Sequence, residues 1–316
     1  MSDAGGKSPR SGKKPHAPTR AEARAAVADI EAQVRARNDK LNERSGRPLI
    51  AAIVIGVALG GGLLLSLLLV KELFMVFAGL LIVFAVYELA TALRSSGRDV
   101  PRIPVIVGAV AIVPAAFYGL ERGHWLAFLG GVALVCVWRL IEQVVPSRRA
   151  SARDVVKDLA AGAFILAYVA FFAGFAVLLT AEEGGQWWTL SFLIVVVSVD
   201  VGAYATGINF GKHKMAPAIS PKKTWEGFAG SAIFAVVGAI LLAIFLLQQP
   251  WWVGLLLGLL MTLTATAGDL TESLIKRDLG IKDISTFLPG HGGFLDRLDS
   301  IILSAPVAFA FYLLFA

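Results

Sequence analysis

The sequence predicts an all-α polytopic membrane protein of about nine transmembrane helices, with its N-terminus in the cytoplasm and its C-terminus outside. Three observations support this fold class. Hydrophobic residues make up 57% of the 316 residues, charged residues make up 16% against about 25% in soluble domains, and the apolar residues gather in long runs. Together with a mean hydropathy of +0.72, these values exclude a water-soluble globular domain, a disordered chain and a coiled coil.

Nine apolar segments follow Arg47. Each is about long enough to cross a bilayer core of roughly 30 Å at about 1.5 Å per residue. We expect the membrane spans at about 48–70, 72–93, 103–120, 124–143, 158–180, 187–209, 228–247, 250–270 and 300–316.

The distribution of Lys and Arg supports both the number of spans and their orientation. With a cytoplasmic N-terminus, the predicted inner segments hold 26 of the 29 Lys and Arg, and the outer loops hold only Lys71 and Arg122. An excess of Lys and Arg is typical of cytoplasmic loops. A missed or extra span would move every later loop to the opposite side of the membrane and remove this excess. The outer loops are too short for a catalytic domain, so we expect function on the cytoplasmic face.

The chain divides into three predicted regions. Residues 1–47 are a cytoplasmic basic tail, expected to be partly disordered with a helix at about 19–44. Residues 48–186 are the N-terminal transmembrane helices, and residues 187–316 are a catalytic transmembrane region with cytoplasmic loops 210–227 and 271–299. The tail alone carries +5 of the net charge of +6, which indicates a segment near anionic lipid and no nucleic-acid partner. The single Cys136 excludes an intramolecular disulfide framework and a Cys-based zinc site.

The first polar cluster combines an intramembrane acid with a basic loop. Asp200 stands in a run of apolar residues, where a carboxylate is costly and is a candidate functional group. The following loop holds Ser220, Lys222, Lys223 and Thr224, which suit an anion. The alternatives are a protonated Asp200 that bonds a neighbouring helix and an ordinary positively charged inner loop.

The second polar cluster lies where the eighth predicted span meets the cytoplasm. If that helix continues, Asp269, Glu272, Ser273 and Lys276 share one face at positions i, i+3, i+4 and i+7. A salt-bridged helix end is the alternative interpretation.

The third polar cluster surrounds the start of the ninth predicted span. Lys282 and Asp283 precede Pro-Gly-His291-Gly-Gly, and Asp296, Arg297 and Asp299 follow. Simple capping of a helix N-terminus by acidic groups is the alternative, but it does not explain a His flanked by glycines.

The three clusters together indicate phosphoryl or nucleotidyl transfer. Carboxylate oxygens suit Mg²⁺, which often uses one or two carboxylates together with substrate phosphates. Lys and Arg would neutralise those phosphates, and positioning with charge neutralisation supplies most of the catalysis in such reactions.

Residues 273–299 carry a resemblance to a known family. They read Ser-Leu-Ile-Lys-Arg277, four residues, Lys282-Asp283, and after four more residues Leu-Pro-Gly-His-Gly-Gly-Phe-Leu-Asp-Arg-Leu-Asp299. This pattern resembles the full signature of the phosphatidate cytidylyltransferases (CDP-diacylglycerol synthases). The similarity covers about residues 190–316, and it includes Asp200-Val-Gly-Ala-Tyr204 and Ser220-Pro-Lys-Lys-Thr-Trp-Glu-Gly227. Asn209 is a departure, because family members often carry a basic residue there.

The resemblance implies an Mg²⁺-dependent reaction in which CTP and phosphatidate give CDP-diacylglycerol and pyrophosphate. Its implied catalytic residues are Asp296, Lys276, Arg297 and His291. Its implied substrate-binding residues are Ser220, Lys222, Lys223, Thr224, Ser273, Arg277 and Lys282. Its implied metal ligands are Asp269, Asp296, Asp299 and, less directly, Asp200.

Two other function classes and one other enzyme are weighed against this reading. A secondary transporter could use Asp200 as an ion or proton site, but no inverted repeat is visible. The paired-Asp pattern of a CDP-alcohol phosphotransferase does not appear, and a structural scaffold would not need five inner-face Asp. We expect a multi-pass protein of the bacterial inner (plasma) membrane with its active site facing the cytoplasm. A homodimer packed through small residues such as Gly56 and Gly60 is left open.

Overall fold

The computed structural model describes residues 49–285, 287 and 292–316. The predicted tail helix at about 19–44 and the predicted catalytic residue His291 therefore lie outside the described residues. Residues 53–316 form one compact unit, and the described residues before it are the first residues of helix α2.

The described chain is helical apart from one short hairpin, which confirms the all-α class. Seven of its helices are long and apolar enough to cross a membrane. The helices are α2 (Leu49–Leu69), α3 (Lys71–Ser95), α4 (Arg102–Glu142), α5 (Ala152–Ile165), α6 (Phe172–Ala181), α7 (Gly185–Phe210), α8 (Trp225–Phe245), α9 (Trp251–Asp278) and α10 (Leu295–Phe315). Each of the nine predicted apolar segments overlaps one of these helices or, for 158–180, both α5 and α6, but the number of crossings and their orientation stay predictions.

Helix α4 contains two of the predicted segments, because its two arms are antiparallel. Leu120 has φ 50° and ψ −146°, far from helical values, and it interrupts the helix between the arms. A Cβ on Gly108 would lie 3.2 Å from the Cα of Gly131, so the two arms touch where neither residue has a side chain. The chain therefore reverses near Leu120, as segments 103–120 and 124–143 require.

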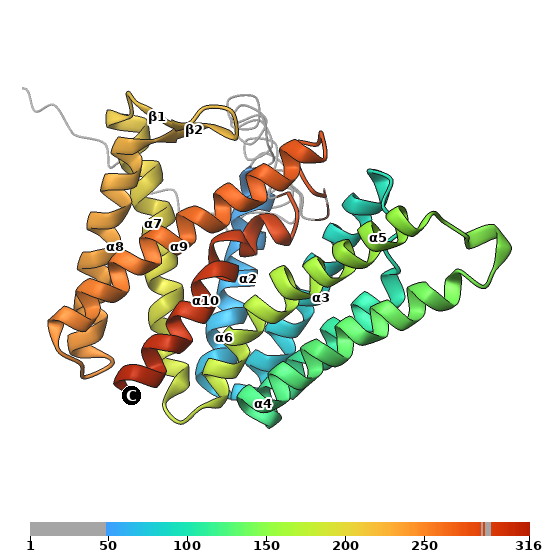
Figure 1. Ribbon diagram of the computed structural model, residues 1–316. Coiled ribbons are helices and arrows are strands. Elements are labelled where there is room, and N and C mark those ends of the chain that lie inside the picture. The colour runs from blue at the N-terminus through green and yellow to red at the C-terminus, as the bar shows by residue number, and fades with distance from the viewer. Residues whose placement is uncertain (1–48, 286, 288–291) are drawn as a thin grey trace, which may run out of the picture. The chain divides into compact units, whose positions relative to one another are not determined.

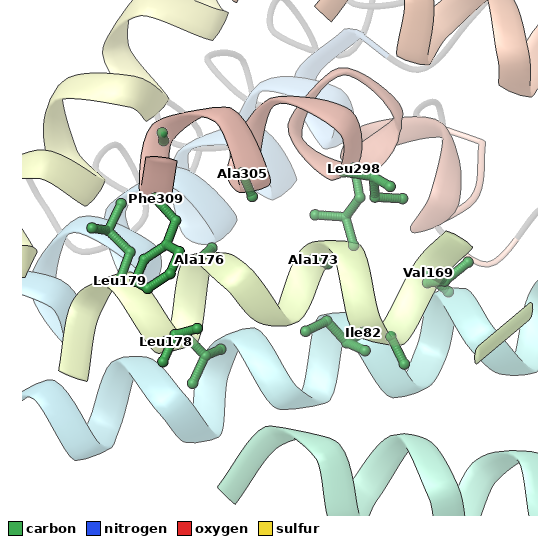
Figure 2. Close-up of a cluster of buried hydrophobic side chains, with 14 of the residues drawn as sticks. Ile82, Val169, Ala173, Ala176, Leu178, Leu179, Leu298, Ala305 and Phe309 are labelled. Atoms are coloured by element: carbon green, nitrogen blue, oxygen red, sulfur yellow. The ribbon is translucent and has the colours of Figure 1, made fainter. Parts of the chain in front are cut away.

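Helices α5 and α6 are continuous through a π-helical turn at Leu166–Phe171. Helix α6 packs against α10 and also against α3 (Figure 2). The cluster in that figure joins Leu298, Ala305 and Phe309 of α10 to Ala173 and Ala176 of α6, and all five are buried. This core holds the N-terminal turn of α10 beside the earlier helices.

In the second half of the unit, from α7 to α10, each helix packs against the next one in the chain. Helix α7 packs against α8, α8 against α9, and α9 against α10 (Figure 1). Between α7 and α8, strands β1 (Lys214–Ala216) and β2 (Ser220–Thr224) pair antiparallel, with Lys214 opposite Thr224. The sequence analysis expected only a loop at 210–227, because two short polar strands show no alternation of apolar and polar residues.

The hairpin is fastened to the start of α8 by two side chains. Glu226 accepts hydrogen bonds from the backbone N–H groups of Lys212 (3.1 Å) and His213 (3.2 Å). Thr224 is the N-cap residue of α8, and its hydroxyl accepts from the N–H of Gly227 at 3.1 Å. The hairpin is thus positioned by the helix that follows it.

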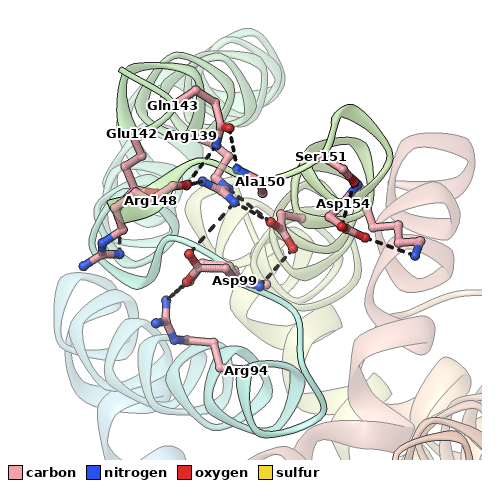
Figure 3. Close-up of polar contacts among 12 residues, drawn as sticks. Arg94, Asp99, Arg139, Glu142, Gln143, Arg148, Ala150, Ser151 and Asp154 are labelled. Carbon is pink, nitrogen blue, oxygen red and sulfur yellow. Dashed lines mark hydrogen bonds and ion pairs between the residues drawn. The ribbon is translucent and has the colours of Figure 1, made fainter. Parts of the chain in front are cut away.

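A buried ion pair joins α4 and α5 at the end where the α4–α5 connection lies (Figure 3). The guanidinium of Arg139 is 1% exposed and donates from Nη2 (2.8 Å) and Nε (3.1 Å) to Oδ2 of Asp158. Asp158 also accepts from the N–H of Asp99 at 2.9 Å. Arg139, which the sequence places inside a predicted span, thus has its counter-charge on the neighbouring helix.

Removing one partner of this pair should destabilise the protein. Asp158→Ala leaves the buried Arg139 with only its longer ion pairs, to Glu142 (3.6 Å) and Asp99 (3.9 Å), so we expect a loss of about 3 kcal/mol in the free energy of unfolding. The measurement is denaturant unfolding in detergent micelles. Lys157→Ala removes an exposed partner of Asp154 and should cost less than about 1 kcal/mol. Equal losses in the two variants would contradict the assignment.

Candidate active site

The last turns of α9 present four polar side chains on one face. Helix α9 continues to Asp278, so the predicted alignment of Asp269, Glu272, Ser273 and Lys276 is confirmed. Lys276 Nζ lies 2.7 Å from Oε2 of Glu272, whose side chain is 2% exposed. Ser273 donates to Asp269 at 3.3 Å. The Glu272–Lys276 pair within α9 is the salt bridge of the alternative interpretation, but Lys276 also pairs with a carboxylate of another helix.

Lys276 connects α9 to the first turn of α10. Its Nζ also lies 2.8 Å from Oδ1 of Asp296, so one ammonium group lies between two carboxylates. The other oxygen of Asp296 accepts from the N–H of Gly293 at 2.7 Å. Asp296 therefore does contribute to the helix start, as simple capping predicts, and it also takes part in an ion pair between helices.

The β1–β2 hairpin reaches the same face of α9. Lys223 Nζ of strand β2 lies 2.6 Å from Oδ2 of Asp269, and both side chains are partly exposed. Arg277 donates to the carbonyl oxygen of Ile219, in the hairpin turn, at 3.3 Å. Two predicted cations are thus held where the hairpin meets the end of α9.

Two further carboxylates adjoin the α9–α10 contact. Ser300 donates from its N–H to Asp299 (2.7 Å) and from its hydroxyl to Asp200 of α7 (3.4 Å). The backbones are close here, because a Cβ on Gly268 would overlap the carbonyl oxygen of Asp299. A glycine before Asp269 therefore lets α9 and α10 approach with their acidic residues side by side.

The remaining predicted residues differ in position. Lys222, Lys282 and Arg297 are exposed, as is Asp283. Ser220 begins β2, opposite Ala216. Thr224 is 5% exposed and its hydroxyl is engaged in capping α8.

One carboxylate at this site comes from a helix to which the sequence analysis assigned no role. Glu88 of α3 is 1% exposed and accepts from the N–H groups of Phe294 (3.0 Å) and Leu295 (2.9 Å) and from the hydroxyl of Ser285. The signal for it was available, since Glu88 interrupts the apolar run 73–93 as Asp200 interrupts its own span. Its partners are about 200 residues away in the chain, so no spacing pattern could reveal them.

The donor set suits a cation that also binds substrate phosphates. Across residues 49–285, 287 and 292–316, no three His, Cys, Asp or Glu side chains gather closely enough to hold a metal ion by themselves. Mg²⁺ commonly takes only one or two carboxylates and completes its shell with water and phosphate oxygens. Oε1 of Glu272 is buried and has no hydrogen-bond partner among the same residues, so acceptor capacity remains at the site.

The fold and the site define a multi-pass membrane protein in which carboxylates and cations from four elements, α7, β2, α9 and α10, lie close together. The chain belongs to the cytidylyltransferase family, whose family model matches residues 50–315.

Curated relatives named phosphatidate cytidylyltransferase align with the chain, the mycobacterial proteins over most of its length. The Mycobacterium bovis protein is 41% identical over 271 residues, which cover 84% of this chain and 88% of the relative. The Mycobacterium leprae protein is 41% identical over 281 residues, covering 86% and 90%. The Brucella suis protein is 41% identical over 151 residues, covering 46% and 56%.

Removing Lys276, which lies between α9 and α10, should cost more stability than removing the partly exposed Lys223. Lys276→Met leaves the carboxylates of Glu272 and Asp296 buried without their counter-charge, so we expect a loss of about 3–5 kcal/mol in the free energy of unfolding. Lys223→Met breaks a pair that is partly open to solvent and should cost about 1 kcal/mol or less. Denaturant titration of both variants in the same detergent measures the difference, and a similar loss in both would show that Lys276 does not join the two helices.

Proposed function

We propose that the protein is a membrane nucleotidyltransferase that converts CTP and phosphatidate to CDP-diacylglycerol and pyrophosphate in phospholipid synthesis. The observation that carries this proposal is the arrangement of Lys276, Glu272 and Asp296 across α9 and α10, in a chain whose family relatives carry the name of that enzyme. The two named substrates meet at a membrane surface, since one is a lipid and the other a soluble nucleotide.

The reaction joins two anionic groups. A phosphate oxygen of phosphatidate attacks the α-phosphorus of CTP, the bond from that phosphorus to the oxygen bridging the α- and β-phosphates breaks, and pyrophosphate leaves with the electron pair. The nucleophile is already anionic, so no strong general base is needed. The main demands on the protein are to hold the two groups in line and to lower their mutual repulsion.

The cations of the site supply that neutralisation in our proposal. Lys276, Lys223 and Arg277 are held in place by Asp296, Asp269 and the hairpin. When substrate phosphates bind, these cations can exchange part of their carboxylate contacts for phosphate oxygens. The exposed cations Lys222, Lys282 and Arg297 can then approach the outer phosphates.

Mg²⁺ fits the same proposal as the cofactor, since it would neutralise phosphate charge and favour the in-line arrangement. The carboxylates that would hold it are Asp269, Asp296, Asp299 and Asp200. Ser220, Thr224, Ser273 and His291 would add hydrogen bonds to the substrates.

The alternative of a secondary transporter keeps little support. Asp200 is exposed on α7 and accepts from Ser300 at 3.4 Å, which joins it to the proposed catalytic helix α10. The family assignment favours the enzyme. An active site facing the cytoplasm of the inner membrane, and a homodimer, remain proposals.

Transfer of the nucleotide can be followed with CTP labelled at two positions. Purified protein with phosphatidate and Mg²⁺ should move label from the α-phosphorus of CTP into the lipid fraction. Label at the γ-phosphorus should appear in water-soluble pyrophosphate and not in lipid. Without phosphatidate neither transfer should occur. Absence of α-label in the lipid would refute the proposal.

Loss of the Asp296 charge should reduce turnover strongly. For Asp296→Asn we expect kcat to fall by more than about 100-fold, or roughly 2.7 kcal/mol in transition-state stabilisation. Asp278→Asn is the matched control, because Asp278 is exposed at the end of α9 and lies among unspecified positions of the signature. Steady-state rates of both variants, corrected for folded protein, decide the point. Near-normal turnover of Asp296→Asn would remove Asp296 from the catalytic set.

A further inference from the structure

The N-cap residue of α10 supplies no capping side chain, and within α10 only Asp296 reaches back, to the N–H of Gly293. That N-cap residue is Phe294, whose side chain has no hydrogen-bond acceptor and forms no cap. The first N–H groups of any helix lack partners within the helix. Here a buried carboxylate from another helix, Glu88 of α3, accepts from the N–H groups of Phe294 and Leu295 at 3.0 and 2.9 Å.

The polar groups that contact the carboxylate of Glu88 are hydrogen-bond donors. Besides the two N–H groups, the hydroxyl of Ser285 donates to its Oε1. A carboxylate also interacts favourably with the positive end of a helix. Three donors therefore converge on one buried side chain that is 1% exposed.

Two neighbouring residues, Phe84 of α3 and Gly293, support the contact between Glu88 and the start of α10. The ring of Phe84, one turn before Glu88, stacks on the ring of Phe294 with centroids 4.8 Å apart and planes 15° apart. Gly293 lies directly against the carboxylate, since a Cβ there would be 2.7 Å from Oε2 of Glu88. A larger residue at 293 would therefore displace the carboxylate of Glu88 or the hydroxyl of Ser285.

Glu88 and Asp296 accept from the N–H groups of three consecutive residues, 293–295. The N–H of Gly293 donates to Asp296, and the next two N–H groups donate to Glu88. Any rotation of this turn that released Glu88 would also displace Asp296 from Lys276 on α9. The position of Asp296 thus depends on a residue that lies more than 200 positions earlier in the chain.

We propose that Glu88 is a positioning residue for the active site, which holds the first turn of α10 so that Asp296 meets Lys276. The inference rests on the proposed function for its catalytic consequence, but not for the contact itself. Glu88 touches no substrate; it acts through the backbone at 293–295 and through Asp296.

The test compares Glu88→Gln with wild type in kinetics and in hydrogen exchange. Gln is nearly the same size as Glu, but its amide NH₂ replaces one acceptor oxygen. This NH₂ would face a hydrogen-bond donor, so one of the present contacts would be lost. We expect kcat to fall by about 10- to 100-fold with little change in KM, as small misplacements of catalytic groups can produce. We also expect faster amide exchange in peptides that cover 292–298, and unchanged exchange in α8.

Two further variants separate positioning from loss of stability. Asp158→Ala removes another buried carboxylate, at the α4–α5 ion pair, and should lower stability while leaving kcat per folded molecule unchanged. Ser285→Ala removes one of the three donors and keeps Glu88, so its loss in kcat should be smaller. It also serves as the decisive variant if Glu88→Gln does not fold.

A double-mutant cycle tests whether Glu88 acts through Asp296. In an Asp296→Asn background, most of the kcat loss from Glu88→Gln should disappear, because groups that act as a unit are not additive. Fully additive losses, unchanged exchange at 292–298, or a folded Glu88→Gln variant with wild-type kcat would each overturn the proposal. If wild type transfers no label from CTP but exchange at 292–298 still rises in Glu88→Gln, the proposed function fails and the positioning contact stands.

Discussion

The ammonium group of Lys276 is the interaction on which the arrangement of the site depends. It lies between a carboxylate of its own helix, Glu272, and one of α10, Asp296. All three side chains have low exposure, so each charge has given up much of its hydration and relies on the others. The two helices can carry this acidic cluster at close range only while the cation remains between them.

The other contacts of the site follow from that constraint. Because α9 and α10 must come close near Gly268, no side chain separates Asp299 from the start of the acidic face. Asp269 is left to one side, where Lys223 of the hairpin balances it. Two ammonium groups therefore hold the acidic face of α9, Lys276 toward α10 and Lys223 toward the hairpin.

Much of the fold could be predicted from the sequence, because membrane helices can be recognised from the length and hydropathy of apolar segments. The apolar segments, the helical face from Asp269 to Lys276 and the grouping of acidic residues near Asp296 all follow from one-dimensional patterns. The antiparallel arms of α4 were implied by the segments 103–120 and 124–143. The β1–β2 hairpin was not predictable, since its strands are polar and only three and five residues long.

The sequence could not show how the groups are paired. Lys223 and Asp269 are distant in the chain, and either Asp269 or Asp296 could have been the partner of a given Lys. The neighbours of Thr224 predict a substrate ligand, but they do not show that its hydroxyl also caps α8. Glu88 could be recognised as an unusual intramembrane acid, but its partners come from the opposite end of the chain. Pairing depends on the packing of α6 between α3 and α10, which no local pattern encodes.

The link from α3 to α10 has a consequence for how the protein can diverge. The signature segment at residues 273–299 carries the family pattern, whereas the early helices contribute mainly apolar residues. A buried carboxylate on α3 that accepts from the backbone of the signature turn ties the two together. Suppose that the first helices were exchanged for those of a distant relative. The chimera would keep the turn at 293–295 in place only if the incoming helix carried an acidic residue at the position of Glu88.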